Sequence, residues 1–348
     1  MTVLFLYTEL AGYSMDCFRE HLRLHPEDKI HVVHYPINPE APFQFQIPEG
    51  VELHEKKKLG TEGIYDLIKQ IRPSLILMSG WQDKAYLRLA RMAGKTYRFV
   101  LCLDNTWRGT LKQWLLLLPA RMILRTVAQF CWVPGEPQRN YAIKLGFDPK
   151  KVYTGFYAAS LQRYREIGKK KKTVERPKRF LVVARYIPQK GYDILWKSFI
   201  SLHSEGFNQW ELWCAGTGPL YEHRVQYPGI RHLGFVQPDE MEYLVSQTDV
   251  FVLPSRFEPW GVAVQEFAAA GMPLILSDAV NAHHAFLKTD ENGFLFKNGD
   301  TASLKNALKT MMQTTEEKRH KMGQISAELA GMYDTHAWSV TLHKLASV

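Results

Sequence analysis

Short apolar segments alternate with more polar stretches along most of the chain. Segments that are apolar along their whole length are typical of parallel strands covered on both faces. The stretches between them fit helices, for example Tyr192–Ser204 and Pro238–Gln247. This alternation predicts an α/β fold. The predicted strands are Val3–Tyr7, Ile30–Tyr35, Leu75–Met78, Phe99–Leu103, Phe130–Val133, Phe180–Ala184, Trp210–Ala215, Val250–Leu253 and Leu274–Leu276.

A polar, basic segment over residues 161–179 interrupts this alternation near the middle of the 348 residues. We interpret it as a linker between an N-terminal domain, 1–160, and a C-terminal domain, 180–332, with a terminal helix over 333–348. Strands and helices alternate on both sides of the linker, which predicts two doubly wound, Rossmann-like domains facing each other across a cleft. In such sheets ligands bind beyond the carboxyl ends of the strands, so the loops there should carry the chemistry.

The formal net charge of the whole chain is +9. Its basic residues are concentrated in the first half. Residues 84–125 contain nine Lys or Arg and one acid, Asp104. Such a surface suits nucleic acid, anionic lipid or a phosphate-bearing acceptor, and a merely solvated basic face is an equal alternative. Because no nucleic-acid-binding motif accompanies the charge, we do not expect nucleic acid as a partner.

The four cysteines are widely spaced without a C-x-x-C, which favours a reducing compartment, and the first residues are typical of a strand rather than a signal peptide. The apolar run Trp114–Ala120 is too short to cross a membrane. We therefore expect a cytoplasmic protein. The segment Leu111–Phe130 is apolar nearly all round, which fits a buried helix or one that dips into a membrane. Burial is slightly favoured, and the alternative is peripheral attachment to the inner face of an anionic membrane.

Two loops carry candidate phosphate ligands. Thr8–Ser14 follows the first strand, and its Gly12 would let the backbone come close to a phosphate, although a plain tight turn explains it as well. Arg185 ends a buried strand and Lys190 follows five residues later. A guanidinium and an ammonium group above one sheet edge are a suitable pair for a pyrophosphate.

The strongest pattern is Val250–Pro273, where a buried strand leads through a Pro-Trp-Gly turn into a helix from about Val262. Glu258 falls at the helix N-terminus, where Gly261 and Val262 offer free N–H groups. Glu266 falls in the first turns of the helix among apolar neighbours, where a carboxylate needs hydrogen-bond donors. Vicinal sugar or ribose hydroxyls are natural donors for both carboxylates.

In these residues the chain resembles the retaining glycosyltransferases of the GT-B fold, in particular family 4 (glycosyl transferases group 1). Glu258 and Glu266 match the E-x7-E signature of that family, and Arg185 and Lys190 match its diphosphate-binding Arg and Lys. Two further segments are similar to the family's base-binding loop and to its segment before the linker: Leu233–Val236 with Asp239–Met241, and Thr154–Tyr157.

The resemblance implies a role for each matching residue. Glu266 would hold the ribose, Phe235 and Val236 would adjoin the base, and Glu258 would hold the transferred sugar. Backbone N–H groups at Gly261 and Val262 would face the sugar and distal phosphate. Arg185 and Lys190 would neutralise the diphosphate leaving group, and Gly12 would let the N-terminal loop close over that diphosphate. The resemblance also implies that no metal or other cofactor is required, in agreement with the lack of a D-x-D motif. It implies further that the C-terminal domain binds the nucleotide sugar, that the N-terminal domain binds the acceptor, and that the terminal helix over 333–348 crosses back onto the N-terminal domain.

One position departs from the family pattern. Where the family usually has a His close to the donor sugar, this chain has Asp104, followed by Asn105. Asp104 is a candidate for contacting a sugar hydroxyl or orienting the acceptor, and a structural N-cap or ion-paired role is the simpler alternative. Trp81–Lys84, after another predicted strand, are candidates for the acceptor side.

We therefore predict a retaining, metal-independent hexosyltransferase that moves a sugar from a UDP- or GDP-linked donor to a glycan or lipid-linked glycan acceptor, as in polysaccharide biosynthesis. Two alternatives remain: a nucleotide-sugar epimerase of the same fold, which needs no acceptor, and a non-catalytic protein that binds an anionic polymer or membrane.

Overall fold

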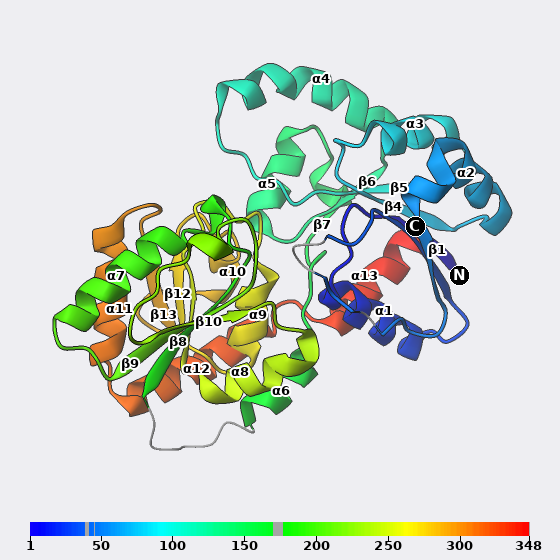
Figure 1. Cartoon of the computed structure of the whole chain (residues 1–348). Helices are drawn as coiled ribbons and strands as arrows, with labels where there is room; N and C mark the ends of the chain where they lie inside the picture. Colours follow the sequence, from blue (N-terminus) through cyan, green and yellow to red (C-terminus); the bar gives the residue numbers. More distant parts are fainter. Residues whose placement is uncertain (39–41, 45, 170–176, 348) are drawn as a thin grey trace. The chain divides into compact units, whose positions relative to one another are not determined.

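The computed structural model describes residues 1–38, 42–44, 46–169 and 177–347, which form two compact units. Of these residues, unit 1 comprises 1–38, 46–159 and 333–347, and unit 2 comprises 42–44, 160–169 and 177–332. Each unit contains a parallel β-sheet with helices on both faces (Figure 1). The predicted α/β fold with two Rossmann-like units is therefore confirmed.

The sheet of unit 1 has the strand order β3-β2-β1-β4-β5-β6-β7. Alternate residues of β1 point to opposite faces: Leu4 and Leu6 pack in one core cluster, and Val3 and Phe5 pack in another. Burial on both faces explains why this strand is apolar throughout. The strands are β1 (Thr2–Leu6), β2 (Lys29–His34), β3 (Val51–Glu55), β4 (Leu75–Ser79), β5 (Phe99–Cys102), β6 (Phe130–Trp132) and β7 (Val152–Tyr153).

Two helical layers cover this sheet. The first comprises α2 (Lys56–Ile71), α3 (Lys84–Ala93), α4 (Leu111–Val127) and α5 (Glu136–Lys144), and the second comprises α1 (Gly12–Leu24) and α13 (Thr335–Ser347). The helix α13 packs beside α1 and buries Trp338 against Phe5 of the sheet, with ring centroids 6.0 Å apart. Residues 333–347 thus complete the core of unit 1.

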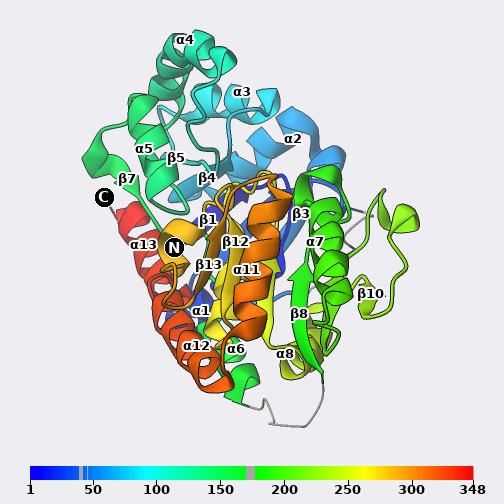
Figure 2. The same cartoon turned by 90° about the vertical axis from the view of Figure 1, so that its left-hand side faces the viewer.

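The sheet of unit 2 has the order β10-β9-β8-β11-β12-β13. Val250 and Val252 of β11 face a core formed with α7 and α11, and Phe251 stacks on Phe267 of α9 on the opposite face. Figure 2 shows α7 and α11 side by side. The strands are β8 (Lys178–Val183), β9 (Trp210–Ala215), β10 (Ile230–Gly234), β11 (Val250–Leu253), β12 (Leu274–Ser277) and β13 (Gly293–Phe296). The helices are α6 (Leu161–Lys169), α7 (Tyr192–Ser204), α8 (Met241–Gln247), α9 (Val262–Ala269), α10 (His283–Phe286), α11 (Thr301–Gln313) and α12 (Glu316–Ala330).

The segment that the sequence analysis interprets as a linker, 161–179, contains regular structure at both ends. Residues 161–169 form α6, which buries Leu161, Tyr164 and Ile167 and packs on α8 and α9 of unit 2. Residues 178 and 179 already belong to β8. Residues 170–176, which carry much of its charge, lie outside the described residues. The apolar residues of α6 recur at helical spacing, but the many charged residues between them made the segment look like a linker.

Candidate functional site

The loops that follow β8 and β11 form the candidate site of unit 2. These two strands are neighbours in the sheet, although β9 and β10 separate them in the sequence. The chain therefore reverses its direction of travel across the sheet between β8 and β11, which is the topological switch point where doubly wound sheets bind ligands. Arg185 and Lys190 lie on the loop after β8, and Glu258 lies on the loop after β11.

Lys190 and Glu258 meet across this switch point. The Lys190 ammonium group forms an ion pair with Glu258 Oε2, and the Ser255 hydroxyl donates to the same oxygen over 3.2 Å. Both charged side chains are largely buried, so each needs the other to offset the loss of hydration. Because the carboxylate has two oxygens and Lys190 has three N–H donors, both groups retain capacity for a ligand.

Main-chain hydrogen bonds hold the Glu258 loop in place. The Glu258 N–H donates to the Ala279 carbonyl over 3.0 Å, and the Asn281 side-chain amide donates to the Glu258 carbonyl over 2.9 Å. The Arg256 N–H donates to the Gln189 carbonyl over 2.7 Å, which ties this loop to the one that carries Lys190. The position of the ion pair is thus fixed by backbone contacts on both sides.

Two glycines allow these loops to approach one another. Gly191, beside Lys190, has φ +69°, and a Cβ there would lie 2.2 Å from the Pro254 carbonyl oxygen. Gly261 has φ +100° and precedes the first residue of α9, Val262, and a Cβ there would lie 3.1 Å from Glu258 Cγ. The N-cap residue of α9 is Gly261, which has no side chain to satisfy the first N–H groups, and the partial positive charge of this helix end lies beside the Glu258 loop.

Glu266 and Arg185 occupy the remaining predicted positions on these elements. Glu266 lies on α9, one turn after Val262, and its side chain is partly exposed. The next residue, Phe267, is buried and packs against Phe251 of β11. Arg185 is partly exposed and precedes the buried Tyr186, whose N–H donates to the Thr217 carbonyl over 2.8 Å. The structure thus places all four predicted side chains on the two switch-point segments, and it brings Lys190 and Glu258 into contact.

Phe235 and Val236 lie at the same edge of the sheet, just after β10, and are partly exposed. The Phe235 ring meets the Phe43 ring edge-on with centroids 5.1 Å apart. Phe43 is an aromatic neighbour that the sequence analysis missed, because no local pattern relates it to β10. The next residue, Gln237, begins a short helical turn through a reciprocal capping box with Glu240.

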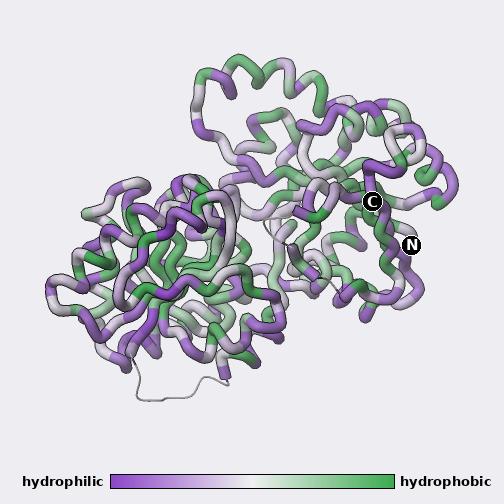
Figure 3. The backbone as a smooth tube through the Cα atoms, viewed as in Figure 1, coloured by the Kyte–Doolittle hydropathy of each residue, from purple (hydrophilic) through white to green (hydrophobic). Residues whose placement is uncertain are grey.

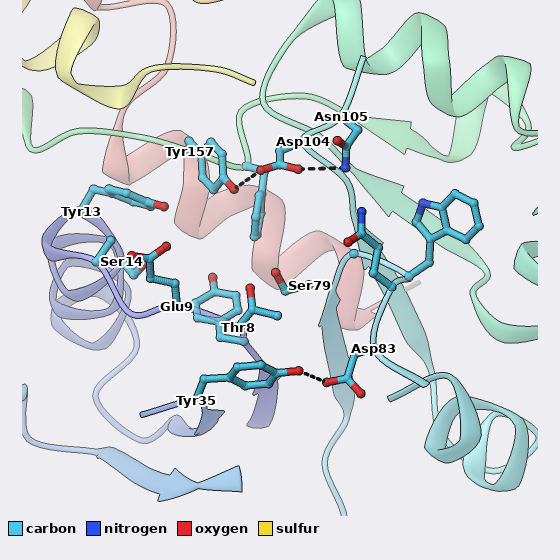
Figure 4. A pocket seen from close by; sticks show the side chains of 16 residues that line it. Thr8, Glu9, Tyr13, Ser14, Tyr35, Ser79, Asp83, Asp104, Asn105 and Tyr157 are labelled. Carbon is cyan, nitrogen blue, oxygen red and sulfur yellow. Dashed lines mark hydrogen bonds between the residues drawn. The ribbon is translucent and has the colours of Figure 1, made fainter. Parts of the chain in front are cut away.

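Unit 1 contains a cavity of about 560 Å³ at its own switch point, between β1 and β4 (Figure 4). Its walls come from the loops after β1, β2, β4, β5 and β7. They include Asp104 and Asn105, as well as Trp81, Gln82 and Asp83 of the predicted acceptor side. Gly12 is the first residue of α1, between the lining residues Ala11 and Tyr13.

Asp104 accepts a hydrogen bond from the Tyr157 hydroxyl over 3.3 Å and another from the Asn105 amide over 3.4 Å. It caps no helix described here, and the cavity surface includes its side chain (Figure 4). Burial, reinforced by the negative charge of Asp104, raises the pKa of Tyr157 and that of the nearby Tyr13. Both phenols therefore stay protonated near neutral pH and can donate hydrogen bonds to an oxygen-rich ligand.

A second polar group on the cavity wall is Asp83, which the sequence analysis assigned to the acceptor side without identifying its partners. Its carboxylate accepts from the Tyr35 hydroxyl over 2.6 Å and forms an ion pair with Lys56. Burial opposes ionisation of Asp83, but the hydrogen bonds from Lys56 and Tyr35 outweigh it and lower the pKa of the carboxyl. Tyr35 ends a predicted strand, which is the one signal that could have placed it at this edge.

Two groups of potential metal ligands occur among the described residues, both in unit 1. They are His25, Asp28 and His343, and His31, Glu52 and His54. In the second group, His31 Nδ1 lies 3.1 Å from His54 Nε2, a distance that one ring N–H bond explains. Neither group contributes to the cavity wall or to the switch-point loops of unit 2.

Residues 164–328 match the family model described as Glycosyl transferases group 1, and this region contains Arg185, Lys190, Glu258 and Glu266. The chain is 29% identical over 188 residues to the glycogen synthase of Gloeobacter violaceus, covering 48% of this chain and 38% of that protein. It is 27% identical to the D-inositol 3-phosphate glycosyltransferase of Corynebacterium glutamicum, covering 61% and 52%. The chain thus spans about half or less of the length of these curated relatives.

A solved structure of similar fold is the Anabaena protein HepE in complex with UDP-glucose, with 16% identity, a TM-score of 0.73 and 100% coverage of both chains. Another is the sucrose-phosphate synthase of Thermosynechococcus elongatus, with 15% identity and a TM-score of 0.76, covering 100% of this chain and 98% of that one. These similarities confirm the fold, and the family model and the curated relatives show that residues 164–328 are similar to the glycosyl transferases group 1 family.

Proposed function

We propose that this protein is a GT-B-type glycosyltransferase that transfers a hexose, with retention of configuration and without a metal, from a nucleotide-sugar donor to a glycan or lipid-linked glycan. The contact between Lys190 and Glu258 at the switch point of unit 2 carries the proposal. It joins a cation suited to a diphosphate with a carboxylate suited to sugar hydroxyls, beside the N-terminus of α9, whose N-cap residue is a glycine. The UDP and UDP-glucose complexes of HepE support a nucleotide-sugar donor.

In the proposed reaction the bond between the sugar C1 and the phosphate oxygen breaks, and the diphosphate leaves with the electron pair. Lys190 and Arg185 stabilise the charge that develops on the diphosphate, which is the work a divalent cation does in other transferases. The acceptor hydroxyl attacks C1 from the face that the diphosphate leaves, and its proton passes to a departing phosphate oxygen. Retention then requires no nucleophilic side chain.

The two carboxylates of unit 2 bind the donor in this proposal. Glu258 accepts hydrogen bonds from the transferred sugar, and Glu266 accepts them from the ribose. Phe235 and Val236 lie beside the base, and the N–H groups of Gly261 and Val262 face the distal phosphate. The cavity of unit 1 binds the acceptor, where Asp104, Tyr157 and Asp83 provide the acceptors and donors that a sugar needs.

A thermal-shift panel of nucleoside diphosphates and nucleotide sugars tests the proposal, because a ligand that binds only the folded protein raises its melting temperature. We expect one nucleoside diphosphate to raise the melting temperature of the wild type and to lose this effect in Glu266→Ala. Glu328→Ala, an exposed glutamate on α12, is the matched control and should respond like the wild type. If none of the nucleotides raises the melting temperature, the proposal fails.

The nucleotide sugar identified in this way is then incubated with candidate acceptors, and nucleoside diphosphate release is measured together with the anomeric configuration of the product by NMR. Transfer with retention supports the full proposal, and inversion rejects the mechanism but not the donor site. An isomerised donor in the absence of acceptor would indicate the epimerase alternative.

A further inference from the structure

Helix α4 of unit 1 exposes a stripe of large apolar side chains, of which only Trp114 makes an aromatic contact, edge-on with Trp107, among those recorded for the described residues. Six of the fourteen exposed large hydrophobic residues among the described residues lie on this one helix. Five of them recur at spacings of three and four residues and are between 58% and 74% exposed. This spacing places them on one face of a helix. The stripe consists of Leu111, Trp114, Leu115, Leu118 and Met122.

The opposite face of α4 faces the protein. Ala120, Leu124 and Val127 are buried in the core of unit 1. The helix therefore has two apolar faces, one packed and one exposed, which explains why the sequence is apolar nearly all round. Burial, the alternative that the sequence analysis slightly favoured, accounts for only one of them. In Figure 3 hydrophobic positions continue along α4, at the outside of unit 1, as well as through the strands.

The charged residues of α4 and of the chain segment around it are all basic. Lys112 and Arg125 on α4 and Arg108 just before it are exposed, and residues 105–135 contain no acidic residue. Lys144 of α5 lies over the neighbouring Trp107 ring, 5.1 Å from its centroid, and 6.0 Å from that of Trp114. A partner must therefore accept apolar side chains and supply negative charge at the same surface.

We infer that this outward face of α4 binds the surface of an anionic phospholipid bilayer, with the helix lying in the interface. An acyl-chain boundary accepts the apolar stripe, while anionic head groups meet the flanking cations. No helix among the described residues is long and apolar enough to cross a membrane, and α4 spans about 25 Å at the usual helical rise. A second copy of the chain is a poor occupant, since a symmetric contact would place like cations against each other.

Sedimentation of the full chain with vesicles tests the inference without any measurement of activity, so its outcome is independent of the proposed chemistry. We expect binding to vesicles of equal parts phosphatidylglycerol and phosphatidylcholine, and at least tenfold weaker binding to phosphatidylcholine alone. Raising the salt from about 0.1 M to about 1 M should weaken the binding, because it screens the head-group charge. Lipids brominated near the head-group end of the chains should quench tryptophan fluorescence less in Trp114→Phe than in the wild type.

The decisive variant is Leu115→Gln/Leu118→Gln/Met122→Gln, which removes the stripe and keeps every charge. We expect at least a tenfold loss of vesicle binding with an unchanged circular dichroism melting temperature. Val340→Gln is the matched control, because this residue of α13 is 54% exposed and lies off the stripe. Wild-type protein that stays in the supernatant with anionic vesicles overturns the inference. Equal binding by the triple variant also overturns it. So does a wild-type dimer that the triple variant no longer forms and that does not bind vesicles.

Discussion

Lys190 and Glu258 lie 68 positions apart in the chain and form a largely buried ion pair between the loops after β8 and β11. From the sequence alone, the two residues are predicted to have separate partners, a diphosphate for Lys190 and a sugar for Glu258. Their contact adds a constraint, because a bound donor must accept a hydrogen bond from Lys190 and donate one to Glu258 without separating the two groups. A buried pair that loses one member leaves the other charge without compensation, so the two residues should behave as one unit.

Lys190→Ala should lower turnover by about 10²-fold or more, because a preorganised cation at the leaving group is lost. Lys178→Ala is the matched control: Lys178 also forms an ion pair, with Glu316, but at the opposite end of β8. Nucleoside diphosphate release under saturating donor measures the effect. The double variant Lys190→Ala/Glu258→Gln should lose less than the product of the two single losses. If the loss of turnover in the double variant equals the product of the two single losses, Lys190 and Glu258 do not act as one unit.

Gly261→Ala should lower both stability and turnover. The left-handed backbone alone costs about 1–2 kcal/mol with a Cβ, and here the Cβ also meets Glu258 Cγ at 3.1 Å. Gly206→Ala separates the two effects, since Gly206 has nearly the same φ, +98°, with no atom within 4 Å of the added Cβ. Urea unfolding should show a loss of stability in both variants, at least as large in Gly261→Ala because of its added contacts, and only Gly261→Ala should lose activity. Equal activity in the two would argue against a role for the Glu258 position.

The stability of unit 1 should fall as the pH falls from about 6.5 to about 4. His21 of α1 is buried between Ser339, 2.8 Å from its Nδ1, and Asp28, 3.0 Å from its Nε2. Burial lowers the pKa of His21 to about 4, against about 6.5 in an unfolded chain. Between these values the unfolded chain binds a proton that the folded state excludes, so His21 costs up to about 3 kcal/mol on acidification.

Urea unfolding at several pH values checks this expectation. His21→Gln should unfold with a shallower pH dependence between pH 4 and 6.5 than the wild type, whatever its stability at pH 7. His336→Gln, an exposed histidine on α13, serves as the control. An identical pH dependence in wild type and His21→Gln would contradict the assignment.

Chelation by EDTA should leave turnover unchanged, because Arg185 and Lys190 supply the positive charge at the diphosphate in the proposed mechanism. Initial rates with and without EDTA, and with added Mg²⁺ or Mn²⁺, measure this directly. A loss that Mn²⁺ restores would contradict metal independence. His54→Gln would then show whether the His31, Glu52 and His54 group is responsible.

The interior strands could be predicted from sequence because they are apolar on both faces. Val250–Leu253 and Trp210–Ala215 have the same bounds in the structure as in the prediction. The edge strand β3 was missed, because its partly exposed sequence, Val-Glu-Leu-His-Glu, alternates apolar and polar positions. The short strand β13 was also missed, since four residues beginning with Gly carry little periodic signal.

The candidate site of unit 2 was predictable because the E-x7-E spacing and the Arg and Lys positions are local patterns at strand ends. The walls of the unit 1 cavity were less predictable. Tyr157 and Lys56 reach Asp104 and Asp83 from other parts of the chain, and such pairings depend on tertiary packing rather than on spacing. The same limit applies to α4, where the sequence shows two apolar faces but only packing shows which of them is covered.

The return of α13 to unit 1 has a consequence for biosynthesis. A ribosome makes the whole of unit 2 before it reaches Trp338, whose ring nitrogen donates to the Phe156 carbonyl inside unit 1. Until then the N-terminal portion lacks one helix of its α1-side layer and leaves Phe5 and Phe18 without their indole neighbour. The N-terminal portion is therefore synthesised first but completes its fold last. Unit 2 can fold while the nascent N-terminal portion still lacks its final helix.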